Sequence, residues 1–158
     1  MPISRPTDAD WAFMRRALEE AQKSFDAGGL PVGAALVADD GSLLAVGSNR
    51  SIQTNDPTSH AEIDCLRHGG LRLGGYDGTC LYSTLSPCPM CTGAILFLGV
   101  PRVVVGERET YEGDIDFLAA RGVDVVVLDD PECRALLRRY VEEGTATWNG
   151  VIAGDRGY

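Results

Sequence analysis

The stretches TSHAEI at residues 58–63 and SPCPMCTGAI at residues 86–95 carry the side chains around which we expect this chain to fold. They contain His60, Cys88 and Cys91, which offer one imidazole and two thiolates to a metal. Zinc prefers four ligands in a tetrahedron, and catalytic zinc sites leave one position open for water, whereas structural sites usually fill all four. We therefore predict one catalytic zinc ion (Zn2+) per chain, held by these three residues.

Glu62 follows the histidine by two residues and is the candidate catalytic residue. Zinc lowers the pKa of its bound water, and the resulting nucleophile needs an adjacent acid/base to move protons to the departing group. A structural alternative exists, because Ser59 followed three residues later by a glutamate is also a helix-capping pattern. A lone C-x-x-C is likewise often redox-active or structural. The combination of H-A-E with P-C-x-x-C, however, is the pattern of zinc deaminases that act on cytosine or adenine.

Both stretches are expected to begin helices. Ser59 with Glu62 predicts a helix start, which places His60 in the first turn. Pro87 suits the first position of the second helix, where its missing N–H costs nothing. The three ligands would then lie at helix N-termini, whose partial positive charge favours thiolate over thiol.

Apolar periodicity along the chain predicts one three-layer α/β/α domain over residues 1–158, with a central five-stranded mixed sheet. Strands are expected at residues 32–38, 43–47, 79–84, 102–106 and 123–128. Helices are expected at residues 8–27, with Asp8 as N-cap, and at 59–68, 87–98, 114–120 and 130–143. The first two strands should form an antiparallel hairpin, and the last two, separated by a helix, should pair in parallel. Residues 48–57 and 69–75 are expected to be loops.

Composition restricts the class of protein. The chain of 158 residues has five cysteines, an odd number, so a disulfide framework is not expected, and Cys65, Cys80 and Cys133 are interpreted as buried inert thiols. The net charge of −9 disfavours tight binding to a nucleic-acid backbone. With neither a signal-like N-terminus nor an apolar run of membrane-spanning length, we expect a cytoplasmic protein with a small-molecule substrate and no membrane partner.

The sequence resembles the cytidine/nucleobase deaminase superfamily, most closely its fungal-type, zinc-dependent cytosine deaminases. Four segments carry the resemblance in order and spacing: GGLPVG at 28–33, HAEI at 60–63, TLSPCPMCTGAI at 84–95 and VVGE at 104–107. The resemblance implies a cytosolic homodimer with one zinc ion per chain, which converts cytosine to uracil and ammonia in pyrimidine salvage.

The resemblance also implies roles for individual residues. Asn49 and the backbone N–H of Ala61 would bind the ring carbonyl, and the Ser86 carbonyl would accept from the exocyclic amine. The slot for the ring would be lined by Val32, Leu85, Tyr111 and Trp148, for which ordinary core packing is the alternative. The C-terminal tail, residues 145–158, would close the active site.

Two positions depart from the fungal-type pattern. Val151 stands where those enzymes carry an acidic residue that contacts a ring N–H, and Ile52 stands where an aromatic residue is expected. Either Asp155 replaces the missing carboxylate or the substrate is another amino-heterocycle, such as guanine, an aminopterin or a triazine. Editing of tRNA adenosine is disfavoured by the acidic charge. In a non-enzymatic alternative, zinc only stabilises an interaction domain and Glu62 merely caps a helix.

Overall fold

The computed structural model describes residues 4–154, so Asp155 lies outside the described residues. The strands are β1 (Gly33–Ala38), β2 (Leu43–Ser48), β3 (Thr79–Leu85), β4 (Arg102–Glu107) and β5 (Asp124–Val127). The helices are α1 (Asp8–Asp26), α2 (Ser51–Thr54), α3 (Ala61–Gly69), α4 (Pro89–Leu98), α5 (Ile115–Ala120), α6 (Pro131–Glu143) and α7 (Thr145–Ile152).

The strands form one five-stranded mixed sheet in the order β2-β1-β3-β4-β5. β1 pairs antiparallel with both β2 and β3, whereas β3, β4 and β5 run parallel to one another. The predicted hairpin of the first two strands and the predicted parallel pairing of the last two are both confirmed.

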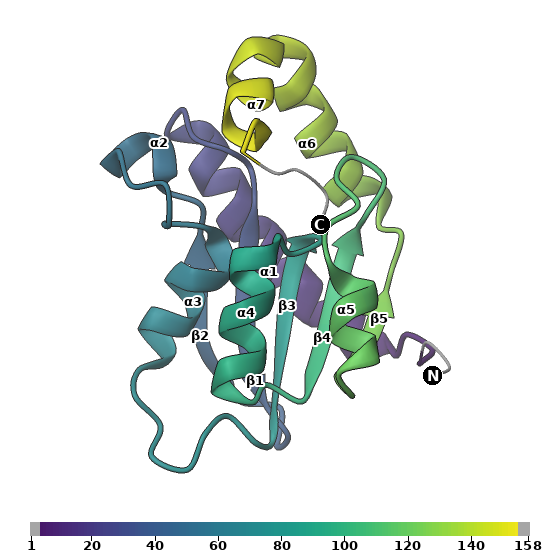
Figure 1. Ribbon diagram of the computed structural model, residues 1–158. Coiled ribbons are helices and arrows are strands. Elements are labelled where there is room, and N and C mark those ends of the chain that lie inside the picture. Colours follow the sequence, from purple (N-terminus) through teal and green to yellow (C-terminus); the bar gives the residue numbers. More distant parts are fainter. Residues whose placement is uncertain (1–3, 155–158) are drawn as a thin grey trace.

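Helices cover both faces of the sheet (Figure 1). One face buries residues of α3, α4 and α5 against side chains such as Leu36, Leu81 and Val103. The other face packs Met14 and Ala17 of α1 and Cys133 of α6 against the alternate residues of the same strands. The predicted three-layer α/β/α sandwich is therefore confirmed.

The edge of the sheet where β3 and β4 end carries the predicted metal ligands, because His60 and Cys88 are the N-caps of α3 and α4. Because these strands are parallel, their carboxyl ends meet at one edge, and the N-termini of α3 and α4 lie there as well (Figure 1). The short helix α2 and the C-terminal helix α7 lie at this same end (Figure 1). In open α/β sheets this edge is the usual place for a ligand site.

Several predicted helix boundaries are wrong. Helix α4 starts at Pro89 rather than Pro87, because Cys88 precedes a proline and is held in an extended conformation, with ψ 170°. His60 is likewise the extended N-cap of α3, with ψ 160°, and does not lie in its first turn. Thr7, not Asp8, caps α1, because its hydroxyl accepts from the Asp10 backbone N–H.

Two segments for which no helix was predicted are helical. The predicted loop 48–57 contains the short helix α2, and the tail contains the two-turn helix α7. Neither segment has an apolar periodicity long enough to predict a helix from the sequence. None of the helices in residues 4–154 combines the length and the hydropathy that a membrane crossing requires.

Candidate active site

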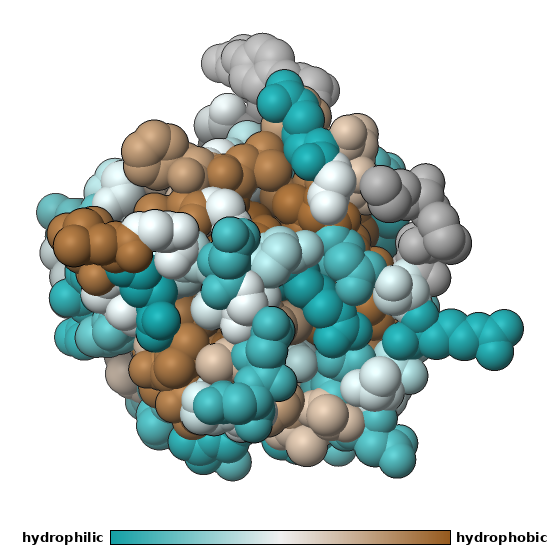
Figure 2. Space-filling view, turned by 90° about the horizontal axis from the view of Figure 1, so that it is seen from below, coloured by the Kyte–Doolittle hydropathy of each residue, from teal (hydrophilic) through white to brown (hydrophobic). Residues whose placement is uncertain are grey.

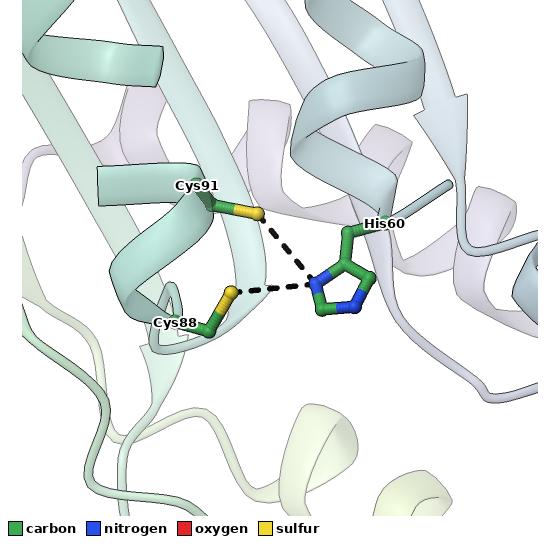
Figure 3. Close-up of side chains that lie close together, drawn as sticks. All are labelled: His60, Cys88 and Cys91. Carbon is green, nitrogen blue, oxygen red and sulfur yellow. Dashed lines mark hydrogen bonds between the residues drawn. The ribbon is translucent and has the colours of Figure 1, made fainter. Parts of the chain in front are cut away.

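Three potential metal ligands converge from two helix N-termini (Figure 3). His60 is the N-cap of α3, Cys88 is the N-cap of α4, and Cys91 lies in the first turn of α4. His60 Nδ1 lies 3.4 Å from Cys88 Sγ and 3.6 Å from Cys91 Sγ. Neither N-cap side chain caps its own helix, so both remain available to bind the same metal ion.

The donor set fits zinc. All three ligand atoms lie within 4.8 Å of one another, and one imidazole nitrogen with two sulfurs is a combination that zinc prefers. Hydrogen bonds from Cys91 and from His60 outweigh desolvation and lower the pKa of the Cys88 thiol to about 4. The site thus stabilises the thiolate form of Cys88, the form that binds a metal, whereas the hydrogen bond with Cys88 and burial raise the pKa of the Cys91 thiol.

Glu62, in the first turn of α3, points toward the metal ligands. Its Oε2 atom lies 3.4 Å from Cys91 Sγ, and its Oε1 atom lies 3.0 Å from the hydroxyl of Ser83 on β3. The carboxyl group is buried, and burial, with the charge of Cys88 as the next cause, raises the pKa of Glu62. The capping interpretation is not supported, because α3 has no side-chain cap and the Ser59 backbone N–H donates to the Asp56 carbonyl.

Glycine at position 47 allows β2 to lie directly against the start of α3. A Cβ atom on Gly47 would lie 2.3 Å from the Cys65 nitrogen and 2.5 Å from the Ala61 carbonyl oxygen. Both distances are shorter than any normal contact, so only glycine fits without movement of the strand or the helix. The close approach fixes the helix turn that carries Glu62.

A cavity of about 340 Å³ opens beside the metal ligands and Glu62. Seven of the nine predicted substrate-binding residues line it: Val32, Asn49, Leu85, Ser86, Tyr111, Trp148 and Val151. Ala61 is buried at the start of α3 and is not among the lining residues, and Asp155 lies outside the described residues. Ile52 is exposed on α2 and does not line the cavity.

Five further lining residues were not predicted from the sequence: Leu30, Pro89, Met90, Ile152 and Gly154. Pro89 and Met90 lie between the two cysteines, so their position in the C-x-x-C stretch could have indicated that they lie beside the cavity. Ile152 follows from the helical conformation of the tail, because it and Trp148 are four residues apart and share one face of α7. Leu30 carried no signal that separates it from ordinary core residues.

Tyr111 reaches the cavity from the loop between β4 and α5. Glu107, fully buried at the end of β4, orders this loop by accepting from the backbone N–H groups of Glu109 (2.7 Å) and Thr110 (2.9 Å). A buried carboxylate that accepts backbone N–H groups is a strong local constraint. The sequence did not predict this role for Glu107.

Comparison with known proteins identifies the family. The model of the cytidine and deoxycytidylate deaminase zinc-binding region matches residues 7–107, which include the ligand set and Glu62. Cytosine deaminase from Candida albicans is 42% identical over 138 residues, which cover 86% of this chain and 91% of that protein. The tRNA-specific adenosine deaminase of Haemophilus influenzae is 43% identical over 111 residues, or 69% of this chain and 64% of that protein. The structure of guanine deaminase from Nitrosomonas europaea superposes with a TM-score of 0.68 at 28% identity, and the match covers 89% of this chain and 95% of that one.

The chain therefore belongs to the family defined by the cytidine and deoxycytidylate deaminase zinc-binding region. It is a zinc-dependent hydrolytic deaminase, and His60, Cys88 and Cys91 form its possible zinc site. The resemblance, the enzyme class and the zinc cofactor predicted from the sequence are confirmed. The relatives are named for cytosine, guanine and tRNA adenosine, so the family alone does not determine the substrate.

Proposed function

We propose that the protein hydrolytically deaminates a free nucleobase, and that this base is cytosine, converted to uracil and ammonia. The observation that carries the proposal is the small, mostly apolar cavity lined by Glu62 and by two of the three metal ligands, His60 and Cys88, with Cys91 buried next to them. Its volume of about 340 Å³ lies at the lower end of the range for small-molecule sites. The cytosine deaminase relative, 91% of which is covered by the match, supports the same substrate class.

In this proposal His60, Cys88 and Cys91 hold the zinc ion. When bound, zinc supplies a Lewis acid that makes water a nucleophile near neutral pH. Glu62 accepts a proton from the attacking water and delivers it to the exocyclic nitrogen as a C–O bond forms and the C–N bond breaks. Its buried position, 3.4 Å from the Cys91 sulfur, supports this role, because it sets the carboxylate next to a metal ligand.

The remaining polar contacts orient the base. We propose that Asn49 and the backbone N–H of Ala61 donate to the ring carbonyl, while the Ser86 carbonyl accepts from the amine. Ser86 is held by its backbone N–H, which donates to the Glu107 carbonyl (2.9 Å), and by its hydroxyl, which donates to the Glu112 carbonyl (2.7 Å). A rigid acceptor of this kind favours a substrate that carries an NH2 group.

Apolar walls would hold the plane of the ring. Val32, Leu85, Tyr111 and Trp148 supply these walls in the proposal, and α7 closes the cavity with Trp148, Val151 and Ile152. An aromatic side chain gives a large apolar contact with a flat heterocycle. A tail that covers the ring would also exclude water from the reacting atoms.

A second candidate substrate class follows from Val151. This side chain lines the cavity, and Glu62 is the only carboxylate among the lining residues that the structure describes. A substrate that presents a ring N–H to Val151 would leave that group without a partner, unless Asp155 provides one. An amino-heterocycle with an apolar or unprotonated edge on that side, such as a triazine, an aminopterin or a purine, is therefore the alternative to cytosine.

We also propose that the enzyme acts in the reducing environment of the cytoplasm, in pyrimidine salvage.

We further propose that the protein forms a homodimer. Leu71, Leu73 and Phe97 are 90%, 92% and 89% exposed, and a hydrogen bond from Tyr76 to Leu98 ties the loop before β3 to the end of α4. Figure 2 views the molecule from the end where this loop lies, and apolar patches are visible there between hydrophilic side chains. Exposed apolar side chains of this kind are common at subunit contacts. Sedimentation at micromolar concentration tests this proposal, and a monomer would contradict it without affecting the chemistry.

An ammonia-release screen tests the substrate. The zinc-loaded protein is incubated with cytosine, guanine, adenine, their nucleosides, a pterin and an aminotriazine, and Glu62→Gln serves as the inactive control. Release from cytosine that disappears in the control supports the proposal. Release only from another heterocycle would support the second class, and release from none of the compounds would contradict both.

A further inference from the structure

Asn49 is held at almost every polar atom. Its backbone N–H donates to the Val32 carbonyl (2.9 Å), and its carbonyl accepts from the buried Ser24 hydroxyl (2.6 Å). Its side-chain Oδ1 accepts twice from Ser51, from the backbone N–H (3.1 Å) and from the hydroxyl (2.7 Å). Within residues 4–154 no group accepts a hydrogen bond from Nδ2, which is therefore the side-chain atom left for a ligand.

The direction of this amide follows from chemistry. An amide can rotate to exchange its oxygen and nitrogen, but a backbone N–H can only donate, so the atom that faces Ser51 must be Oδ1. The Ser51 hydroxyl adds a second donor to the same atom. Asn49 is buried and lines the cavity, so a fixed oxygen on one side presents N–H donors on the other.

Ser51 is not needed for the core. It is the first residue of α2, a helix of four residues of which none is buried. Its hydroxyl and its backbone N–H make no other hydrogen bond to the described residues than those to Asn49. The hydrogen bonds that this residue donates are therefore directed at one side chain of the proposed active site.

We propose that Ser51 is a positioning residue, which holds the Asn49 amide so that Nδ2 donates into the cavity. This inference rests on the proposed function, in which Asn49 binds the ring carbonyl of the base. The consequence is selectivity: the substrate must present an acceptor to Asn49, and a base with an N–H at that place would face an unpaired donor.

The test compares two ligands that differ by one carbonyl. Inhibition constants of uracil and of 4-pyrimidinone, which lacks the 2-carbonyl group, are measured for the zinc-loaded native protein and for Ser51→Ala. Loss of the hydroxyl should raise the inhibition constant of uracil about fivefold to tenfold, because uracil offers the acceptor to Asn49. The inhibition constant of 4-pyrimidinone, which lacks this acceptor, should change by less than about twofold. Ser51→Thr retains a hydroxyl and should restore uracil binding.

Thr54→Ala is the matched control. Thr54 lies on the same short helix, but its hydroxyl donates to the Arg50 carbonyl (2.8 Å) and not to Asn49, so this variant should bind both ligands normally. Equal weakening of both ligands by Ser51→Ala, or no weakening, would overturn the positioning role.

If the native protein neither deaminates cytosine nor binds uracil, the proposed substrate is wrong, but the positioning role of Ser51 is still open to a test. The Ser51 inference is then decided by the side-chain ¹⁵N–H2 signals of Asn49, assigned through Asn49→Asp. Ser51→Ala should shift and broaden this pair while Thr54→Ala leaves it in place. A pair that is unchanged in Ser51→Ala would overturn the inference.

Discussion

Glu62 Oε2 and Cys91 Sγ lie 3.4 Å apart, although the two residues are separated by 29 positions in the chain. The contact joins the first turn of α3 to the first turn of α4 and places a buried carboxyl group beside a metal ligand. Ser83, on the strand between these helices, holds the other carboxylate oxygen. A carboxyl group in such surroundings matches the requirement for an acid/base next to a metal better than the requirement for a helix cap.

Glu62→Gln should therefore retain the fold and the zinc ion but lose at least about a hundredfold in kcat. The amide preserves the shape and the contact with Ser83, but it cannot transfer protons. The measurements are kcat for the released ammonia, zinc content and melting temperature. A variant that is about 1 kcal/mol less stable but almost fully active would instead indicate a capping role.

Val151→Asp should raise kcat/KM for cytosine about tenfold, because the new carboxylate can accept from a ring N–H that valine leaves unpaired. Val151→Ala is the control, since it removes the apolar group without adding an acceptor. If cytosine activity is already high, Val151→Asp leaves it unchanged and Asp155→Ala abolishes it, then Asp155 makes the contact and this interpretation of Val151 is wrong.

Gly47→Ala should destabilise the protein by about 1–3 kcal/mol and reduce kcat, because its Cβ would collide with the first turn of α3. Urea unfolding and steady-state kinetics measure the two effects. Gly93→Ala is the matched control: this exposed glycine lies inside α4, and its Cβ would meet no atom within 4 Å. The control should stabilise the protein by about 0.5–1 kcal/mol, and equal behaviour of the two variants would contradict the packing argument.

Asp10 of α1 binds Arg102, the first residue of β4, at the end of this strand that is remote from the metal ligands. Burial alone would raise the pKa of Asp10, but the Thr7 backbone N–H, the Arg102 guanidinium and the Tyr82 hydroxyl together lower it. Arg102 binds both carboxylate oxygens, at 3.1 and 3.0 Å.

A lowered pKa means that this stabilisation is complete above the ordinary aspartate value of about 3.9 and is lost as the pH falls through the lower folded-state value. Asp10→Asn should therefore cost about 1.5–3 kcal/mol in the free energy of unfolding at pH 7. The difference from the native protein should shrink in acid. Urea unfolding at several pH values measures it, and a difference that does not depend on pH would contradict the assignment.

The sequence was most informative where a local pattern has a single physical meaning. The spacing of His60, Cys88 and Cys91 predicted the metal ligands, and the apolar strands predicted the sheet. Where two local signals compete, the prediction was weaker. Pro87 and Pro89 are both acceptable helix starts, and only the extended backbone of Cys88 shows that the second proline begins α4.

Other features depend on contacts between distant segments, which no local pattern contains. Glu62 satisfied a capping pattern with Ser59, yet its partner is Ser83 on β3. The orientation of Asn49 depends on where α2 places Ser51. The helical tail brings Ile152 to the cavity beside Trp148.

We propose above that a zinc ion at His60, Cys88 and Cys91 acts with Glu62 in the deamination of a nucleobase. The most direct measurement is ammonia release from cytosine while zinc is titrated into metal-free protein. We predict that activity is absent at the start, rises in proportion to bound zinc and reaches its plateau at about one zinc ion per chain. Full activity in the metal-free protein, or a zinc-saturated protein that releases no ammonia from cytosine or any other amino-heterocycle, would contradict it.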